Sequence, residues 1–227
     1  MTRGGGAEGG KARGRSFAAA LCIALAAALT MPSAVAFSAS PPAMANPQEA
    51  ADLQRIAAYL NSIHTMTARF AQVSSDGRTA SGSLWLERPG RMRFEYDPPS
   101  PILLIADRFY VYYIDKDLAE VSQIGLKSTP AWFLLRDPIR FGNELAVTGF
   151  QSDPGFLRVT VEERAHPDLG SLTMTFSRAP LRLRQWTILD SQGRTTTVTL
   201  SQEQFGMALP ADLFQYRNPY TGRSTEP

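Results

Sequence analysis

The sequence predicts a mainly β protein of the α+β class, with one N-terminal helix and then about eleven short antiparallel strands in a barrel or sandwich. Three observations support this fold class. Apolar and polar residues alternate with a period of two in residues 66–71, 83–87 and 91–96. Turn signals such as Asp76-Gly77 and Pro89-Gly90 recur about every ten residues. A single apolar stripe with helical spacing precedes the strands.

The predicted N-terminal helix covers residues 48–63. Its apolar stripe consists of Leu53, Ile56, Leu60 and Ile63, which recur at spacings of three and four. Residues 37–47 before it are rich in Pro, Ala and Ser and have nothing to bury, so they are interpreted as a spacer.

The strands follow from period-two patterns. The strictest covers residues 91–96, where Met92, Phe94 and Tyr96 share one face and charged residues share the other. The other candidates are 66–71, 83–87, 101–106, 109–114, 118–123, 145–150, 156–162, 171–177, 183–190 and 195–203. Strands with this pattern bury one face and expose the other to water.

One interruption of the strand pattern covers residues 128–136. Ser128 is a capping residue, Pro130 suits the first turn of a helix, and the following residues are almost wholly apolar. This segment is predicted to form a short buried helix. Periodicity alone leaves open whether the two helices cover a hydrophobic cavity or a filled hydrophobic core.

Residues 1–36 have the features of an export signal. A basic segment ending at Arg15 precedes the apolar stretch 17–31, and Ala34-Val35-Ala36 fits a signal peptidase site, with Ala43-Met44-Ala45 as a weaker candidate. The alternative is a buried N-terminal helix. Cys22, the single cysteine, lies inside the apolar stretch, so the mature protein is predicted to have neither a disulfide nor a lipid anchor. Its predicted location is the periplasm.

Charge and composition argue against several functions. The chain has a formal net charge of +2, but four of its 23 basic residues and one of its 21 acidic residues lie within 1–36, so the remainder carries −1. Nucleic-acid binding is therefore not expected. The two histidines, His64 and His166, have no second metal ligand near them in sequence, and Asp115 and Asp117 fit a solvated turn. We expect no metal, no cofactor and no enzymatic activity.

Residues 82–99 carry a family resemblance. The order Arg88-Pro89-Gly90, followed by alternating arginine and apolar or aromatic residues up to Tyr96, resembles the periplasmic lipoprotein carriers of the Lol pathway, the LolA family. Further matches are Leu53-x-x-Ile56, Leu60, Phe70-x-Gln72, residues 102–107, Tyr110-x-Tyr112-Tyr113-x-Asp115, Thr129-Pro130, Leu213-Phe214 and Pro219. One departure is Arg108, which stands where family members commonly carry glycine.

The resemblance implies an incomplete eleven-stranded antiparallel β-barrel with a helical lid over a hydrophobic cavity for acyl chains. The carrier domain would cover residues 48–219, followed by a polar tail, 220–227. The implied partners are triacylated or diacylated lipoproteins as cargo, an inner-membrane ABC transporter that releases them and an outer-membrane acceptor. A monomer is expected. The alternative function is periplasmic binding of free lipids or glycolipids.

The resemblance also implies roles for individual residues. Arg88 would hold the lid shut by bonding its backbone carbonyls. The predicted cavity wall consists of Leu53, Ile56, Leu60, Leu84, Leu86, Met92, Phe94 and Tyr96. The predicted lid helix contributes Pro130, Trp132, Phe133, Leu134 and Leu135.

Overall fold

The computed structural model describes residues 46–217. The predicted export signal and its cleavage sites, residues 37–45 of the spacer and the polar tail 220–227 lie outside the described residues. Within residues 46–217, no helix has the length and apolar character needed to cross a membrane.

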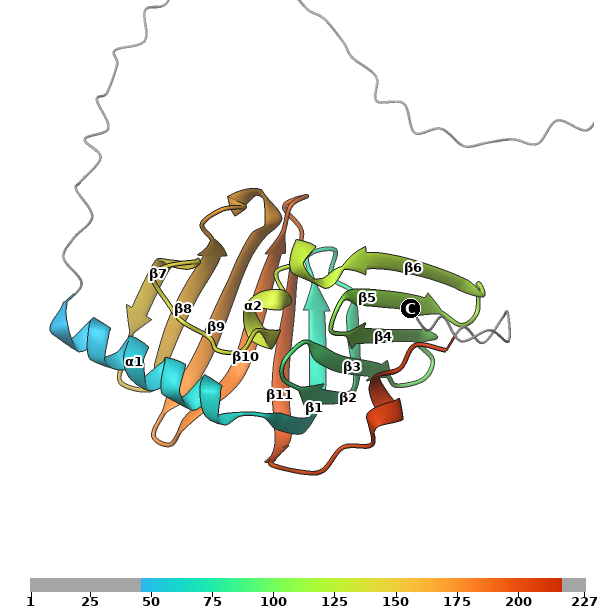
Figure 1. Cartoon of the computed structure of the whole chain (residues 1–227), viewed down its shortest axis with the longest axis horizontal. Helices are drawn as coiled ribbons and strands as arrows, with labels where there is room; N and C mark the ends of the chain where they lie inside the picture. Colours follow the sequence, from blue (N-terminus) through green and yellow to red (C-terminus); the bar gives the residue numbers. More distant parts are fainter. Residues whose placement is uncertain (1–45, 218–227) are drawn as a thin grey trace, which may run out of the picture. The chain divides into compact units, whose positions relative to one another are not determined.

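Eleven antiparallel strands form one sheet, as the sequence predicts (Figure 1). They are β1 (Thr65–Ser74), β2 (Thr79–Glu87), β3 (Arg91–Tyr96), β4 (Ile102–Asp107), β5 (Tyr110–Asp115), β6 (Glu120–Gly125), β7 (Leu145–Ser152), β8 (Phe156–Glu163), β9 (Gly170–Arg178), β10 (Leu181–Asp190) and β11 (Thr195–Phe205). Strands β1–β6 and β7–β11 each form a meander, and β1 pairs with β11 to join them. Strands β6 and β7 are the two edges, so the sheet is curved but not closed.

Helix α1 (Pro47–Ser62) precedes the sheet and begins one residue before the predicted start. The Asn46 side chain accepts a hydrogen bond from the Gln48 amide at 3.1 Å, and Pro47 occupies the first turn. An N-cap asparagine followed by proline is a strong helix start, because the cap satisfies an orphan amide and proline fixes φ near its helical value. Helix α1 ends at Ile63, whose backbone is extended.

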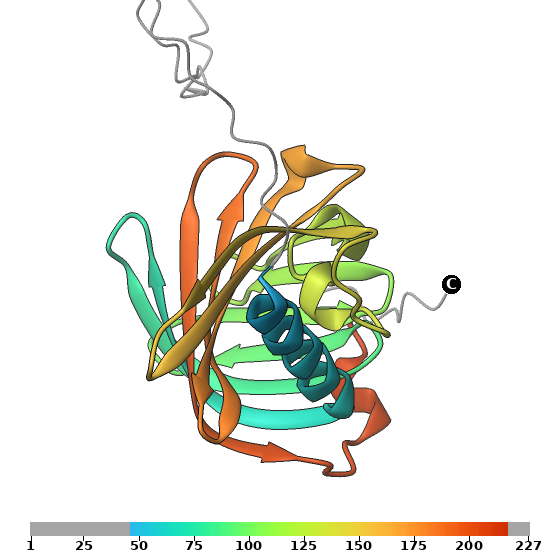
Figure 2. The ribbon, with the colours of Figure 1, turned by 90° about the vertical axis from the view of Figure 1, so that its left-hand side faces the viewer.

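The chain between β6 and β7 carries the segment predicted to form the second lid element. Because β6 and β7 lie at opposite edges of the sheet, their connection crosses the concave side (Figure 2). It holds the 3-10 helix η1 (Leu126–Ser128) and the helix α2 (Trp132–Leu135). Two further 3-10 helices are η2 (Pro167–Leu169) and η3 (Ala211–Phe214).

Helix α2 is shorter than the predicted segment. It has one turn, its N-cap is Ala131 without a side-chain hydrogen bond, and Ser128 belongs to η1 instead. The prediction of Ser128 as the capping residue is therefore wrong. The next hydroxyl, on Thr129, donates to the Leu126 carbonyl at 2.8 Å and stabilises the preceding turn.

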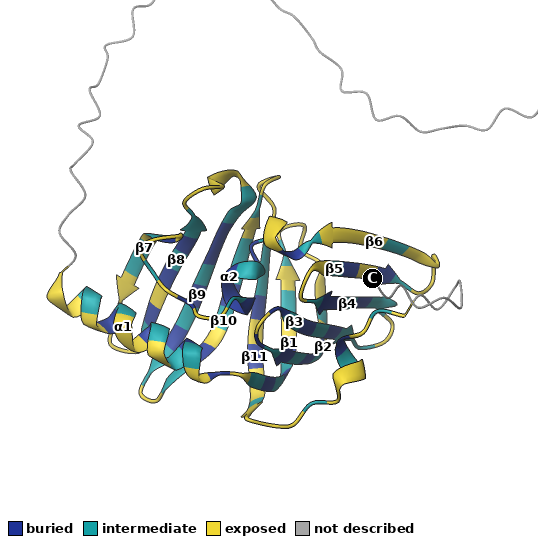
Figure 3. Cartoon of the chain, in the orientation of Figure 1, coloured by how far each residue is buried: buried dark blue, intermediate teal, exposed yellow. Residues whose placement is uncertain are grey.

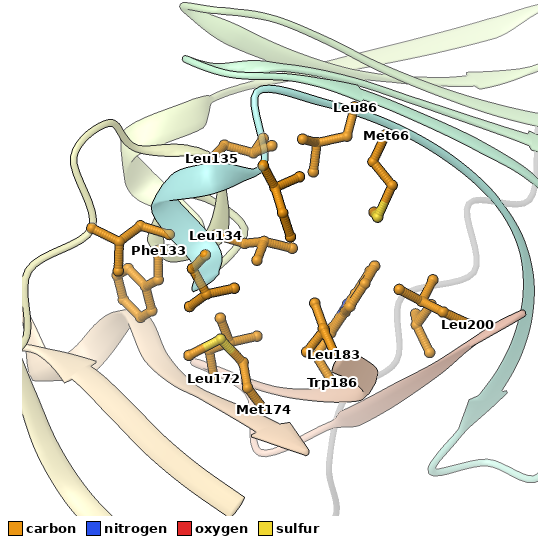
Figure 4. Packing of buried hydrophobic residues seen from close by; sticks show 14 of the residues in the cluster. Met66, Leu86, Phe133, Leu134, Leu135, Leu172, Met174, Leu183, Trp186 and Leu200 are labelled. Atoms are coloured by element: carbon orange, nitrogen blue, oxygen red, sulfur yellow. The ribbon is translucent and has the colours of Figure 1, made fainter. Parts of the chain in front are cut away.

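The core lies between the concave face of the sheet and the two helices (Figure 3). Side chains of α2 point toward those of the strands in the close view of the interior (Figure 4). Close packing also explains Gly82 in β2, because a Cβ there would lie 2.6 Å from the ring of Phe70. A smaller cluster of Leu103, Ile105, Tyr112 and Ile114 covers the outer face of β4 and β5 beneath Tyr216.

Candidate functional site

Arg88 follows the last residue of β2 and its side chain turns inward, leaving the residue only 7% exposed. Its Nε donates to the Ile63 carbonyl at 2.8 Å, its Nη1 donates to the Arg136 carbonyl at 3.3 Å, and its Nη2 donates to the Leu60 carbonyl. These acceptors lie at the C-terminal ends of α1 and α2, where helix carbonyls lack intrahelical partners. One guanidinium therefore binds both helices.

The backbone of the same turn adds two hydrogen bonds. The Arg88 amide donates to the His64 carbonyl at 2.8 Å, and the Gly90 amide donates to the Leu135 carbonyl at 2.9 Å. Gly90 has a φ of 79°, and a Cβ on it would lie 2.8 Å from the Cα of Arg108. The turn from Arg88 to Gly90 thus ties the end of each helix to the rim of the sheet.

The Arg88 guanidinium is held by neutral groups. It makes no ion pair with a carboxylate in residues 46–217. Burial lowers the pKa of Arg88 from its ordinary value, while the charge of Asp137 opposes that change. Since a hydrogen bond from a charged donor contributes about 1.5–3 kcal/mol, three of them hold the helices firmly without covalent restraint.

Asn61 joins α1 to the connection that follows α2. Its Nδ2 donates to the Ile139 carbonyl at 2.9 Å, and its Oδ1 accepts from the Ile139 amide at 2.8 Å. Ile139 lies in the connection just after α2. Sequence reasoning missed Asn61, because a single polar residue beside an apolar stripe has the same pattern as a solvent-exposed one.

A second polar group fixes the N-terminal half of α1. Asp52 is completely buried; it accepts from Arg55 at 2.9 Å and from Arg178 of β9 at 3.4 Å. Arg178 also donates to the Ser152 hydroxyl at 2.7 Å and to the Asp153 carbonyl at 3.1 Å. Sequence reasoning missed Asp52 as well. The available signal was its position four residues before Ile56, which places a carboxylate on the apolar face of the helix.

All eight residues of the predicted wall face the concave side and belong to, or pack against, one cluster. They are Leu53 and Tyr96, which are half-buried, and Ile56, Leu60, Leu84, Leu86, Met92 and Phe94, which are buried. Phe94 makes edge contacts with Phe70 and Trp186, with ring centroids 4.8 Å and 6.3 Å apart. The fold thus brings together residues that are up to 43 positions apart in sequence, from Leu53 to Tyr96.

The pocket beneath Arg88 is nearly filled. It is lined by Leu60, Ile63, Met66, Leu86, Arg88, Leu134, Ile139 and Leu183, and its volume is about 10 Å³. A cavity needs about 10–15 Å³ to hold one water molecule. An acyl chain therefore has no room in this pocket while α1 and α2 stay in place.

The residues of the predicted lid helix occupy the middle of the concave side. Phe133, Leu134 and Leu135 are buried, Trp132 is half-buried beneath the Lys127 ammonium at 5.5 Å, and the buried Pro130 lies just before the helix. The interior is thus lined by the lid and the sheet together.

Arg108, the departure from the family pattern, adopts a conformation that suits glycine. Its φ is 92°, and its amide donates to the Gly90 carbonyl at 2.9 Å. A non-glycine residue in this region is strained, by about 1–2 kcal/mol in the left-handed helical conformation. The strain lies directly against the turn that holds the helices.

Known proteins resemble this chain in sequence over most of its length. The family model "Outer membrane lipoprotein carrier protein LolA" matches residues 61–217. Proteins named outer-membrane lipoprotein carrier protein from Nitrosomonas europaea and Chromobacterium violaceum are 29% and 30% identical over 76% and 78% of this chain, and 88% of each relative is covered. A solved DUF1329 family protein from Desulfovibrio piger aligns with a TM-score of 0.47 and 10% identity, covering 73% of this chain and 95% of that one.

The family assignment rests on sequence matches that extend over most of the domain. The matched segment runs from the end of α1 to the residues after η3, so it includes every strand of the sheet and the turn from Arg88 to Gly90. The family model covers well over half of the chain, and the chain therefore belongs to the LolA family.

Proposed function

We propose that this protein is a periplasmic carrier that shields the acyl chains of a lipoprotein. It receives the lipoprotein from an inner-membrane ABC transporter and delivers it to an outer-membrane acceptor. The names of the relatives and the predicted export signal support this proposal. The main observation behind the proposal is that the Arg88 guanidinium donates hydrogen bonds to the ends of both helices, which cover an apolar interior.

The energetics of the cargo explain why a carrier is needed. Burial of an acyl chain contributes about 0.8 kcal/mol per CH₂, so an anchor with roughly 45 methylenes would cost on the order of 35 kcal/mol to leave in water. Delivery requires the carrier to bind the chains more weakly than the acceptor does. An interior that refills with its own lid side chains lowers the net affinity in this way, because cargo must displace those contacts.

The small pocket volume implies that loading moves the lid. Acyl chains would replace Leu60, Leu134 and their neighbours against the inner face of the sheet. The C-terminal ends of α1 and α2 must then leave the Arg88 guanidinium. In this proposal, the arrangement with Arg88 bound to both helices is the closed form of the carrier.

The proposed activity is binding and transfer rather than catalysis. The predicted wall consists of aliphatic, thioether and aromatic side chains. The one ionisable group among them is the Tyr96 phenol, and burial raises its pKa to about 12. It stays protonated near neutral pH and serves as a hydrogen-bond donor to Gln72 at 2.7 Å.

Native mass spectrometry of the protein purified from periplasm without detergent tests the proposal. Adducts with the mass of intact acylated lipoproteins are expected. Adducts of free phospholipid or glycolipid alone would support the alternative function and overturn the carrier proposal.

A substitution in the wall connects such adducts to the concave face. Phe94→Glu places a carboxylate among apolar side chains, so it should abolish adduct formation. Val73→Glu, at a position of β1 that is 50% exposed, is the matched control and should leave the adducts unchanged. Adducts that persist in Phe94→Glu at the wild-type level would contradict binding on this face.

A further inference from the structure

The two edges of the sheet differ in how they are protected. Edge strand β7 contains a register shift between Val147 and Gly149, and such bulges discourage pairing with another chain. Edge strand β6 pairs with β5 without a shift, contains no proline and carries one charged residue, Glu120. Strand β6 is thus a regular, uncovered edge (Figure 3).

The register shows which backbone groups of β6 point away from the sheet. The Leu126 amide donates to the Phe109 carbonyl at 2.8 Å, and this pair continues the β5–β6 register. Hydrogen-bonded and non-hydrogen-bonded pairs alternate in an antiparallel ladder, so the amides and carbonyls of Val121 and Gln123 face outward. Within residues 46–217, these groups make no hydrogen bond to a segment outside the sheet.

The inner face beside this edge continues the apolar surface of the core. Phe94 lies opposite Leu104, which lies opposite Tyr113 of β5, so the three side chains share one face. Tyr113 is 45% exposed and Ile124 of β6 is 50% exposed on this side. An apolar surface and an unpaired edge therefore meet at the same place.

We propose that the β6 edge binds the extended polypeptide that directly follows the acylated N-terminal residue of the cargo. This inference rests on the proposed function. Acyl chains that lie along the inner-face row of Phe94, Leu104 and Tyr113 would end beside β6, so the polypeptide attached to them would start next to this edge. Pairing of an added strand uses backbone groups, so it does not require a particular cargo sequence.

Two triacylated lipopeptides of different length test this inference. One carries two residues after the acylated cysteine, and the other carries ten, enough to pair along β6.

Two variants at one position of β6 test the backbone contact. The Gln123→Pro variant removes an outward amide without breaking the ladder to β5, whereas Gln123→Ala keeps that amide. Gln123→Pro should weaken binding of the long lipopeptide about three- to tenfold, the worth of one or two backbone hydrogen bonds. Gln123→Ala should change it less than twofold, and neither variant should alter binding of the short lipopeptide.

Equal affinity of the wild-type protein for both lipopeptides would overturn the inference while leaving the proposed function intact. Equal weakening of both by Gln123→Pro would overturn it too, because the effect would then be structural. Failure of the wild-type protein to bind either lipopeptide would overturn the proposed function itself, and the inference with it.

Photo-crosslinking gives a readout that needs no proline. Benzoylphenylalanine in place of Gln123 should capture the first residues of the long lipopeptide, whereas the same group in place of Gln151 on the opposite edge should not. Capture from both positions, or capture of a second copy of the chain from position 123, would contradict the inference.

Discussion

The two ends of α1 are held in different ways. At the C-terminal end, Arg88 donates to carbonyls of both helices, and no carboxylate takes part. In the N-terminal half, the buried Asp52 pairs with Arg178, which also contacts Ser152 and Asp153 at the opposite end of the sheet. Loss of Arg88 would remove contacts to both α1 and α2, whereas breaking the Asp52–Arg178 pair would remove a contact to α1 alone. The two ends of α1 thus differ in how many elements depend on each contact.

Removal of the Arg88 guanidinium should have the largest effect. Arg88→Ala removes the side-chain donor from the Ile63 and Arg136 carbonyls and leaves the Leu60 carbonyl with the Ile63 amide alone, so at about 1–3 kcal/mol for each buried carbonyl without a donor we expect a loss of about 3 kcal/mol in unfolding free energy. Urea denaturation measures this change. Arg88→Lys should keep the fold but slow lipoprotein transfer in a reconstituted assay. An ammonium group cannot present several N–H donors in one plane, as the guanidinium does to the three carbonyls. Unchanged transfer by Arg88→Lys would remove the proposed role.

Substitution of Asp52 should have the next largest effect on stability. Asp52→Ala leaves Arg178 partly buried without its carboxylate, and we expect a loss of about 2–3 kcal/mol in unfolding free energy. Hydrogen exchange should then increase in the first turns of α1 but not in α2. Equal increases in both helices would show that the two ends of α1 are not independent.

Asn61 tests how far α1 and α2 move together. Asn61→Ala removes both hydrogen bonds to Ile139, at about 0.5–1.5 kcal/mol each, so a loss of about 1–2 kcal/mol is expected. A double-mutant cycle with Arg88→Ala measures the coupling between the two contacts. A coupling energy near zero would argue that α1 and α2 respond separately.

Arg108→Gly should have the smallest effect and the opposite sign. Glycine adopts a φ of 92° without strain, so the variant should be more stable by about 1 kcal/mol. Thermal unfolding measures the gain. The matched change of Ala119, which has a φ of 52° in the turn between β5 and β6, reports the same relief away from the lid. A loss of stability on Arg108→Gly would mean that its side chain makes contacts worth more than the backbone strain.

Local patterns explain which parts of the fold could be predicted. The alternation in 91–96 and the apolar stripe of Leu53, Ile56 and Leu60 are patterns among residues close together in sequence. The strand at 91–96 and α1 could therefore be predicted from the sequence. The length of α2 could not, because its C-terminal end is fixed by contacts with the distant Arg88–Gly90 turn. The polar contacts of Asp52 and Asn61 could not be predicted either, since Arg178 and Ile139 lie 126 and 78 residues away.

The amino-acid sequence by itself determined the eleven strands, the helix before them, the inward faces of β2 and β3 and the resemblance that singled out Arg88. Only the tertiary structure decided that the pocket beneath Arg88 is nearly filled, that one guanidinium reaches both helices and that β6 remains an uncovered edge. The physical reason is that the spacing of apolar and polar side chains is a local property of the chain. Cavity volume, hydrogen-bond partners and edge exposure depend on which distant segments fold against each other.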